Sequence, residues 1–351
     1  MQKLYTFGCA KYGQIGQGDN EEAHIPKIVS SFDKVAFVSC GLRNTAIIIN
    51  GQLYTCGNGE YGQLGQGTNF DSSVFNIVKD TSSGFINQNI TNVSCGLSHM
   101  AVIVNSRLYT CGFGKYGQLG HGNEENLNVL TLVECLTNVT FVSCGHDFTA
   151  VISNGQLYTF GDNYFGQLGH GEYEYSNVPV LVPHFDNVTY VACGTNHMAI
   201  IKKRNLYTCG WGYSGQLGHG NSINLKVPIC VPNFNDVEFV SCGAKHTAII
   251  QNDQLYTFGS GNEGQLGRNI GSNSYVPICV PNFENVQFVS CGGYHTAVIE
   301  NNQLFTFGCN TNGQLGHKVL IESSIPIHVP SLKYVVNISC GGYHTAVINC
   351  M

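Results

Sequence analysis

Short apolar runs alternate with glycine-rich polar stretches along the whole chain, and residues 35–78 are typical of the pattern. Val35–Cys40 and Thr45–Ile49 are apolar and rich in β-branched residues, and Leu53–Cys56 is a third run of the same kind. Asn50-Gly51 separates the second run from the third, and both residues tolerate the positive φ that a two-residue hairpin turn requires. The pattern predicts three antiparallel strands joined by tight connections.

A fourth, less regular strand is expected after each glycine-rich loop. In the stretch above, this strand lies near Val74–Val78. In other units the corresponding segment carries a proline, at Pro26, Pro179, Pro228, Pro277 and Pro326. Proline lacks the backbone donor of an inner sheet position, so these segments fit an outer edge strand. Each unit is therefore predicted to be a four-stranded antiparallel sheet.

Two motifs repeat seven times with the same period. The first, L-[YF]-T-[FC]-G, leads through four residues to G-Q-[LI]-G, and its copies begin at residues 4, 53, 108, 157, 206, 255 and 304. The second, [VI]-[SA]-C-G, has its cysteine at residues 40, 95, 144, 193, 242, 291 and 340. The steps are 49 residues except for one of 55, which places a single insertion near residues 80–89.

Seven repeated four-stranded units predict an all-β fold, a seven-bladed β-propeller that forms one domain over residues 1–351. A solenoid would need capping repeats, whereas the first and last repeats are nearly as regular as the others. The chain begins at a third strand and ends after a second strand. We therefore expect Leu4–Phe7 and the strand after Pro26 to complete a blade begun by Val336–Cys340 and Thr345–Ile348.

Composition narrows the range of functions. The net charge is −6, and the only basic run, residues 202–204, falls in a predicted turn, so no nucleic-acid partner is expected. Nor does any apolar run approach the length of a membrane span. Seven of the sixteen cysteines share one repeat position, and no secretory signal follows Met1. These features favour a reduced intracellular monomer, cytoplasmic or nuclear rather than secreted.

The combined motif resembles the repeat of the regulator of chromosome condensation family. It reads L-Y-T-F-G-x-x-x-x-G-Q-L-G-x-G, followed by V-S-C-G-x-x-H-T-A-V-I, and it extends over essentially the whole chain. The resemblance implies a seven-bladed propeller, but members of the family differ in function. Some exchange guanine nucleotide on the small GTPase Ran, one class is an ultraviolet receptor, and others are binding modules. The receptor uses a tryptophan cluster, whereas this chain has only Trp211.

An antiparallel blade places the C-G-x-x loops and the G-Q-L-G loops on one face. The Ran exchange factors bind with this face, and the resemblance implies an acidic residue in the third C-G-x-x loop, where Asp147 stands. It implies histidines in the fifth and seventh loops, where His246 and His344 stand. Leu97, however, stands where a second acidic residue is expected. The third repeat also lacks the wedge insertion of the exchange factors, and the insertion near residues 80–89 is expected on the opposite face.

Each of these candidates also has a structural interpretation. Histidine recurs at one position in five repeats, which fits a role in packing or capping each blade. Asp147 also fits a turn residue. No phosphate-binding loop, metal-ligand motif or catalytic pairing is evident, so neither a cofactor nor a metal site is expected.

Aromatic residues mark the G-Q-L-G loops of the first five repeats. The expected partner-binding aromatics are Tyr12, Tyr61, Phe113, Tyr116, Tyr164, Phe165, Trp211 and Tyr213. Repeats six and seven have Asn262-Glu263 and Thr311-Asn312 at these positions. Acidic residues of the same loops, which would rim the arc, are Glu21, Glu22, Glu124, Glu125, Glu172 and Glu174. The alternative is that each ring packs on its own loop.

The sequence therefore favours a non-catalytic protein-interaction propeller that binds a protein partner on this face. The alternative is a guanine-nucleotide exchange factor for a Ran-type small GTPase.

Overall fold

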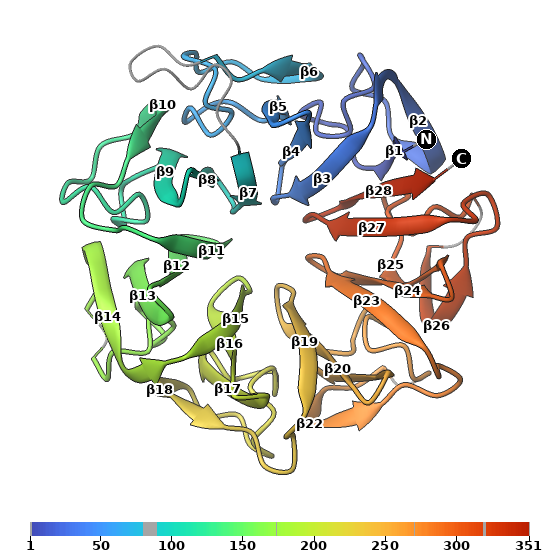
Figure 1. Cartoon of the computed structure of the whole chain (residues 1–351). Coiled ribbons are helices and arrows are strands. Elements are labelled where there is room, and N and C mark those ends of the chain that lie inside the picture. The colour runs from blue at the N-terminus through green and yellow to red at the C-terminus, as the bar shows by residue number, and fades with distance from the viewer. Residues whose placement is uncertain (1, 80–89, 173, 270, 319–320, 351) are drawn as a thin grey trace.

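The computed structural model describes residues 2–79, 90–172, 174–269, 271–318 and 321–350. These residues form 28 strands, which make up seven four-stranded antiparallel sheets. The sheets stand around a central axis like the blades of a propeller, as Figure 1 shows. The predicted fold is confirmed. No helix within the described ranges is long and apolar enough to cross a membrane.

The first three strands of every blade have six or seven residues, as the constant period of the repeats requires. The inner strands are β3 (Val35–Cys40), β7 (Ile90–Cys95), β11 (Val139–Cys144), β15 (Val188–Cys193), β19 (Val237–Cys242), β23 (Val286–Cys291) and β27 (Val335–Cys340). The second strands are β4 (Asn44–Ile49), β8 (His99–Val104), β12 (Phe148–Ser153), β16 (His197–Lys202), β20 (His246–Gln251), β24 (His295–Glu300) and β28 (His344–Cys350).

The two outer layers complete each blade. The third strands are β5 (Gln52–Gly57), β9 (Arg107–Gly112), β13 (Gln156–Gly161), β17 (Asn205–Gly210), β21 (Gln254–Gly259), β25 (Gln303–Cys309) and, from the N-terminus, β1 (Gln2–Gly8). The outer strands are β6 (Ser72–Ile77), β10 (Leu127–Leu132), β14 (Ser176–Asp186), β18 (Leu225–Cys230), β22 (Ser274–Cys279), β26 (Glu322–His328) and β2 (Ala23–Asp33). The outer strands carry the prolines, as expected.

Six blades are continuous in sequence, and the seventh is built from both ends of the chain. Blades 1 to 6 comprise β3–β6, β7–β10, β11–β14, β15–β18, β19–β22 and β23–β26, and the closing blade has the order β27-β28-β1-β2. β1 pairs with β28 without a register shift, from Gln2 opposite Cys350 to Gly8 opposite His344. The termini consequently lie close together in Figure 1. The predicted ring closure is confirmed.

Apolar side chains fill the spaces between neighbouring blades. β4, for example, is buried along its whole length because it lies between the closing blade and blade 2. Ile47 packs with Leu4 and Ile348 of the closing blade, whereas Ile48 packs with Val102 of blade 2. A strand with a blade on each side needs apolar residues on both faces, which explains the continuous apolar runs of the sequence.

Hydrogen bonds also join the inner strands around the ring. The backbone amide of Cys40 donates to Ser339 Oγ of the closing blade (2.8 Å), and that of Cys95 donates to Ser39 Oγ (3.1 Å). The same contact joins Cys144 to Ser94, Cys193 to Ser143, Cys291 to Ser241 and Cys340 to Ser290. Cys242 would meet Ala192 at the seventh position, where the side chain has no acceptor.

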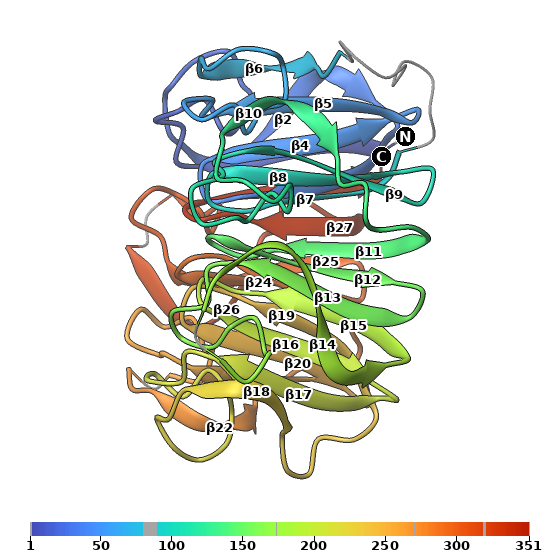
Figure 2. The same cartoon turned by 90° about the vertical axis from the view of Figure 1, so that its left-hand side faces the viewer.

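The ring has two different faces (Figure 2). The loop face carries the C-G-x-x loops, which follow the inner strands, and the glycine-rich G-Q-L-G loops, which follow the third strands. The turn face carries the two-residue hairpin turns and both termini, at the right of Figure 2. The insertion near residues 80–89 lies outside the described residues.

Candidate functional site

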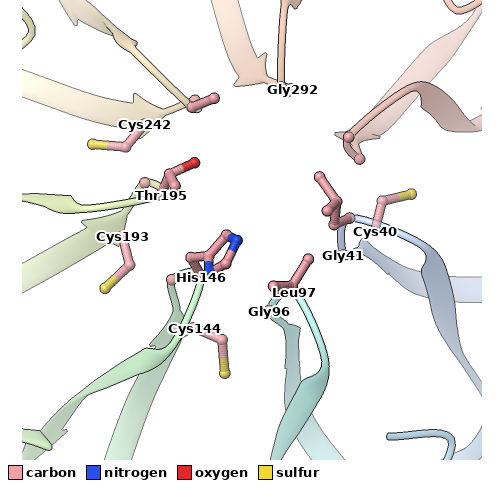
Figure 3. Close-up of a pocket in the computed structure, with 18 of the residues that line it drawn as sticks. Cys40, Gly41, Gly96, Leu97, Cys144, His146, Cys193, Thr195, Cys242 and Gly292 are labelled. Atoms are coloured by element: carbon pink, nitrogen blue, oxygen red, sulfur yellow. The ribbon is translucent and has the colours of Figure 1, made fainter. Parts of the chain in front are cut away.

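A hollow opens on the axis of the loop face, where the seven C-G-x-x loops meet. The residue after each glycine lines it, and these residues are Leu42, Leu97, His146, Thr195, Ala244, Gly293 and Gly342. In Figure 3, Leu97 and His146 point towards the hollow, whereas the labelled cysteines point away from it into the blades. The cysteines of the repeat are thus part of the blade packing and do not form a ring of ligands around the axis.

Asp147 lies on the loop face beside this hollow, with its carboxylate held by two neighbours. Gln118 Nε2 donates to Oδ1 (3.1 Å), and His146 Nδ1 lies 2.6 Å from Oδ2. The Asp147 side chain is 14% exposed and that of His146 is 35% exposed. The Asp147 carboxylate is therefore mostly buried next to His146, which lines the hollow.

His246 and His344 are completely buried, so neither side chain can contact a partner on this face. His246 Nε2 lies 2.9 Å from Thr296 Oγ1 of the next blade, and His344 Nε2 makes the same contact with Thr45. The expectation that these two histidines bind a partner is therefore wrong. They join neighbouring blades, the packing role that their recurrence also indicated.

The same contact occurs wherever the repeat supplies both residues. The other pairs are His99–Thr149, His197–Thr247 and His295–Thr345. Asn44 and Phe148 replace the histidine in two blades, and the next blades then have Met100 and Met198 in place of the threonine. Histidine and threonine are thus present or absent together across each blade interface.

Burial determines the charge of these histidines. It lowers the pKa of His246 to about 3 because the imidazolium would lose its hydration. The glycine of each C-G motif provides the necessary space, since a Cβ on Gly243 would lie 2.3 Å from His246 Cε1. The C-G-x-x-H motif is therefore mainly a packing device, and only its two variable residues face solvent.

The predicted aromatic arc is present on the loop face. Tyr164 is 74% exposed, Tyr213 69% and Tyr116 47%. The remaining rings are half-buried: Tyr12, Tyr61, Phe113, Phe165 and Trp211. These aromatics come from the closing blade and blades 1 to 4, because the G-Q-L-G loop of each repeat precedes its C-G-x-x loop by one blade.

Rings from neighbouring blades contact one another to form two clusters. Tyr61 of blade 1 meets Phe113 of blade 2 at 4.9 Å between ring centroids, and Phe113 meets Tyr116 at 6.0 Å. Phe165 of blade 3 meets Trp211 of blade 4 at 5.7 Å, with Tyr164 and Tyr213 at the two ends. The rings therefore pack against one another across blades, and three of them, Tyr116, Tyr164 and Tyr213, are also exposed to solvent.

Basic and aromatic residues of the C-G-x-x loops extend the arc, and the sequence reasoning missed them. Arg43 stacks on Tyr12, with 4.8 Å from Cζ to the ring centroid, and Lys245 Nζ lies 5.4 Å from the Trp211 ring. Tyr294 of blade 6 and Tyr343 of the closing blade form a half-buried pair with 5.6 Å between ring centroids. All four residues occupy the last variable position of C-G-x-x, the position that Asp147 occupies in the third such loop.

The loop face carries the whole negative excess of the chain. Its loops hold twelve acidic and six basic residues, and the rest of the sequence holds ten of each. The acidic residues are Asp19, Glu21, Glu22, Glu60, Asp71, Glu124, Glu125, Asp147, Asp162, Glu172, Glu174 and Glu263. The basic residues are Lys11, Arg43, Lys115, Lys245, Arg268 and Lys318. This face is thus net negative, whereas the rest of the sequence is neutral.

Family comparisons cover the whole ring. Residues 86–298 match the RCC1-like domain, and residues 3–48, 50–103 and 301–348 match the regulator of chromosome condensation (RCC1) repeat. The ultraviolet-B receptor UVR8 of Arabidopsis thaliana is 31% identical over 140 residues, which are 39% of this chain and 31% of the receptor. The RCC2 homologue of Xenopus laevis is 29% identical over 125 residues, 35% of this chain and 24% of that protein. The aligned part is thus under a third of each relative.

Solved structures share the fold at low sequence identity. Human WBSCR16 has a TM-score of 0.90 at 21% identity, with 99% of both chains covered. Prp20p of Saccharomyces cerevisiae, a structure described together with its binding to Gsp1p and histones, has a TM-score of 0.89 at 16% identity. That match covers 99% of this chain and 91% of Prp20p. At these identities the likeness concerns the fold alone.

Proposed function

Because this chain belongs to the regulator of chromosome condensation family, a family of seven-bladed propellers, we propose that it is a non-catalytic interaction module that binds a protein partner on its loop face. The observation that carries the proposal is the aromatic arc. Three tyrosines, Tyr116, Tyr164 and Tyr213, are between 47% and 74% exposed there. Exposed aromatic groups on a rigid scaffold are typical of interface centres.

The distribution of aromatics supports a partner footprint of five blades. The arc extends from the closing blade through blade 4, whereas the G-Q-L-G loops of blades 5 and 6 have Asn262-Glu263 and Thr311-Asn312 at the equivalent positions. The partner accordingly covers five blades and leaves these two loops free. Acidic side chains at the rim, such as Glu124 and Glu172, favour a partner with a basic surface.

Affinity capture at increasing salt concentration tests this function. The immobilised protein should retain a partner from native cell extract. Retention should decrease between roughly 50 and 500 mM salt, because salt screens the attraction between exposed charges. A variant with Glu124, Glu125, Glu172 and Glu174 changed to Gln should retain less at low salt. Equal retention by this variant would contradict the charge-complementary interface.

The second candidate is a guanine-nucleotide exchange factor for a Ran-type GTPase, and Asp147 is the observation that favours it. Its half-buried carboxylate lies on the loop face at the position that the family resemblance implied. His246 and His344 give no support, because both are buried. If the protein releases fluorescent nucleotide from Ran, Asp147→Ala should slow the release at least about tenfold, equivalent to about 1.4 kcal/mol. Absence of release by the wild-type protein would reject this candidate.

We also propose that the protein is located inside the cell, in the cytoplasm or nucleus. All sixteen cysteines are free thiols, and most of them are buried between blades. Free thiols in this number suit a reducing compartment.

A further inference from the structure

A cleft of about 260 Å³ lies on the circumference of the ring, away from the aromatic arc. Arg268 and Asn269 of the blade 5 loop line one part, Phe283 of the β22–β23 connection lines another, and Phe305 and Ile325 of blade 6 complete it. Phe283 and Phe305 meet edge to face at 5.6 Å. The cleft is therefore mainly apolar, with one cationic side chain in its lining.

Arg268 is an exception to the repeat. The residue that follows G-Q-L-G in the other six repeats is glutamine or histidine, and each contacts a threonine hydroxyl of the third strand. These pairs are Gln17–Thr6, Gln66–Thr55, His121–Thr110, His170–Thr159, His219–Thr208 and His317–Thr306. Thr257 offers the same hydroxyl in blade 5, and its own hydrogen bond to Leu266 is the usual one.

The guanidinium of Arg268 uses little of its donor capacity. Nη2 donates to the carbonyl of Thr257 at 3.4 Å, and the buried Nε has no partner among the described residues. A guanidinium has five N–H donors in a planar fork that matches a carboxylate. The substitution that removes the usual intrablade contact thus places an under-used carboxylate-binding group beside two aromatic rings.

We infer that this cleft binds a small monocarboxylate carrying one aromatic or branched apolar group. Arg268 pairs with the carboxylate, and the apolar group lies against Phe283, Phe305 and Ile325. A cavity of about 150 Å³ is enough for a benzene molecule, so a cleft of 260 Å³ holds one ring and its carboxylate. The inference is independent of partner binding on the loop face, because the cleft and the arc share no residue.

Titration of the purified protein with 3-phenylpropionate and with its neutral amide tests this inference. For a ligand of this size the dissociation constant should be on the order of a few millimolar, observed by ligand-detected NMR. The acid should bind about tenfold more tightly than the amide, because a charged pair replaces a neutral contact. A phenylalanine-terminated peptide, with a free or amidated carboxyl, shows whether the carboxylate comes from a free acid or from a chain terminus.

Two variants identify the groups responsible. Arg268→His restores the residue of four other repeats, where it pairs with the threonine, so the fold and melting temperature should be retained while the preference for the acid is lost. Ile325→Glu, at a side chain that is 52% exposed, places a carboxylate in the cleft and should also abolish binding of the acid. The inference is wrong if neither compound binds, if acid and amide bind equally, or if the preference survives in Arg268→His.

Discussion

His344 Nε2 lies 2.8 Å from Thr45 Oγ1, and this contact joins the closing blade to blade 1 across 299 positions of sequence. Thr45 donates its own proton to the carbonyl of Gln14 at 2.6 Å, so the imidazole is the donor and its proton resides on Nε2. Nδ1 is buried and has no hydrogen-bond partner in the described part of the chain. One neutral histidine tautomer thus links three segments at the point where the ring closes.

The histidine–threonine pairs should be exchangeable for the phenylalanine–methionine pair that the protein uses between blades 3 and 4. Thr296→Met alone removes the acceptor of His246 and leaves a buried donor unpaired, which should cost about 2 kcal/mol of unfolding free energy. Adding His246→Phe reproduces Phe148 and Met198 and should recover most of the loss. Denaturant unfolding measures both variants, and a double variant no more stable than the single one would contradict this role.

Acid should destabilise the ring through the same histidines. Burial lowers the pKa to about 3 for His197, His246, His295 and His344, and to about 4 for His99. Above pH 6.5 the histidines are neutral in the folded and unfolded states and contribute no pH dependence. As the pH falls from 6.5 towards 4, only the unfolded state takes up protons, so each histidine costs about 1.4 kcal/mol per pH unit.

The double variant His246→Phe, Thr296→Met supplies the control for this pH dependence. Between pH 7 and pH 5 it should lose about 2 kcal/mol less than the wild-type protein, because one titrating group is absent. Denaturation midpoints at the two pH values give the comparison. An identical loss in both proteins would show that His246 is not responsible for the acid sensitivity.

Deleting residues 1–30 should destabilise the protein severely. The deletion removes β1 and most of β2, including the fully buried Leu4 and Phe7, and it exposes β28 as an edge. Loss of either side chain alone typically costs several kcal/mol, so the melting temperature should fall by more than about 10 °C. If the truncated protein melted at the wild-type temperature, the closed ring would be refuted.

Thiol reactivity should distinguish the exposed cysteines from the buried ones. Under denaturing conditions all sixteen should react. In the native protein the exposed Cys135 and Cys230 should react first, whereas burial raises the pKa of Cys40 and Cys144 to about 12 and protects them. Disulfides in protein purified without oxidation would argue against an intracellular location.

The constant period of the repeats allowed the fold to be predicted from the sequence. Two motifs that recur seven times with one period predicted the strands, their order in the blade and the closure of the ring by Leu4–Phe7 with Thr345–Ile348. The register, with Leu4 opposite Ile348, came from the structure. Side-chain burial was harder to predict, because Asp147 and His246 occupy adjacent positions of the repeat in two different blades. His246 turns into the blade interface, whereas Asp147 remains at the rim of the hollow.

A comparison of successive repeats would have indicated that the histidines are buried. Asn44 precedes Met100 by one repeat, just as Phe148 precedes Met198, and this joint replacement identifies the histidine–threonine contact. The Tyr294–Tyr343 contact and the stacking of Arg43 on Tyr12 were not predictable in this way. They depend on how loops from different repeats approach one another in three dimensions.

The affinity of the captured partner for two double variants tests the proposed binding face most directly. Tyr116→Ala with Phe165→Ala removes one ring from each aromatic cluster and should weaken binding by more than about 2 kcal/mol, with the melting temperature retained. Asn262→Ala with Asn312→Ala alters the equivalent loops of blades 5 and 6 and should leave the dissociation constant within about twofold of wild type. Equal effects of the two pairs would show that the aromatic arc is a packing feature and would contradict the proposed function.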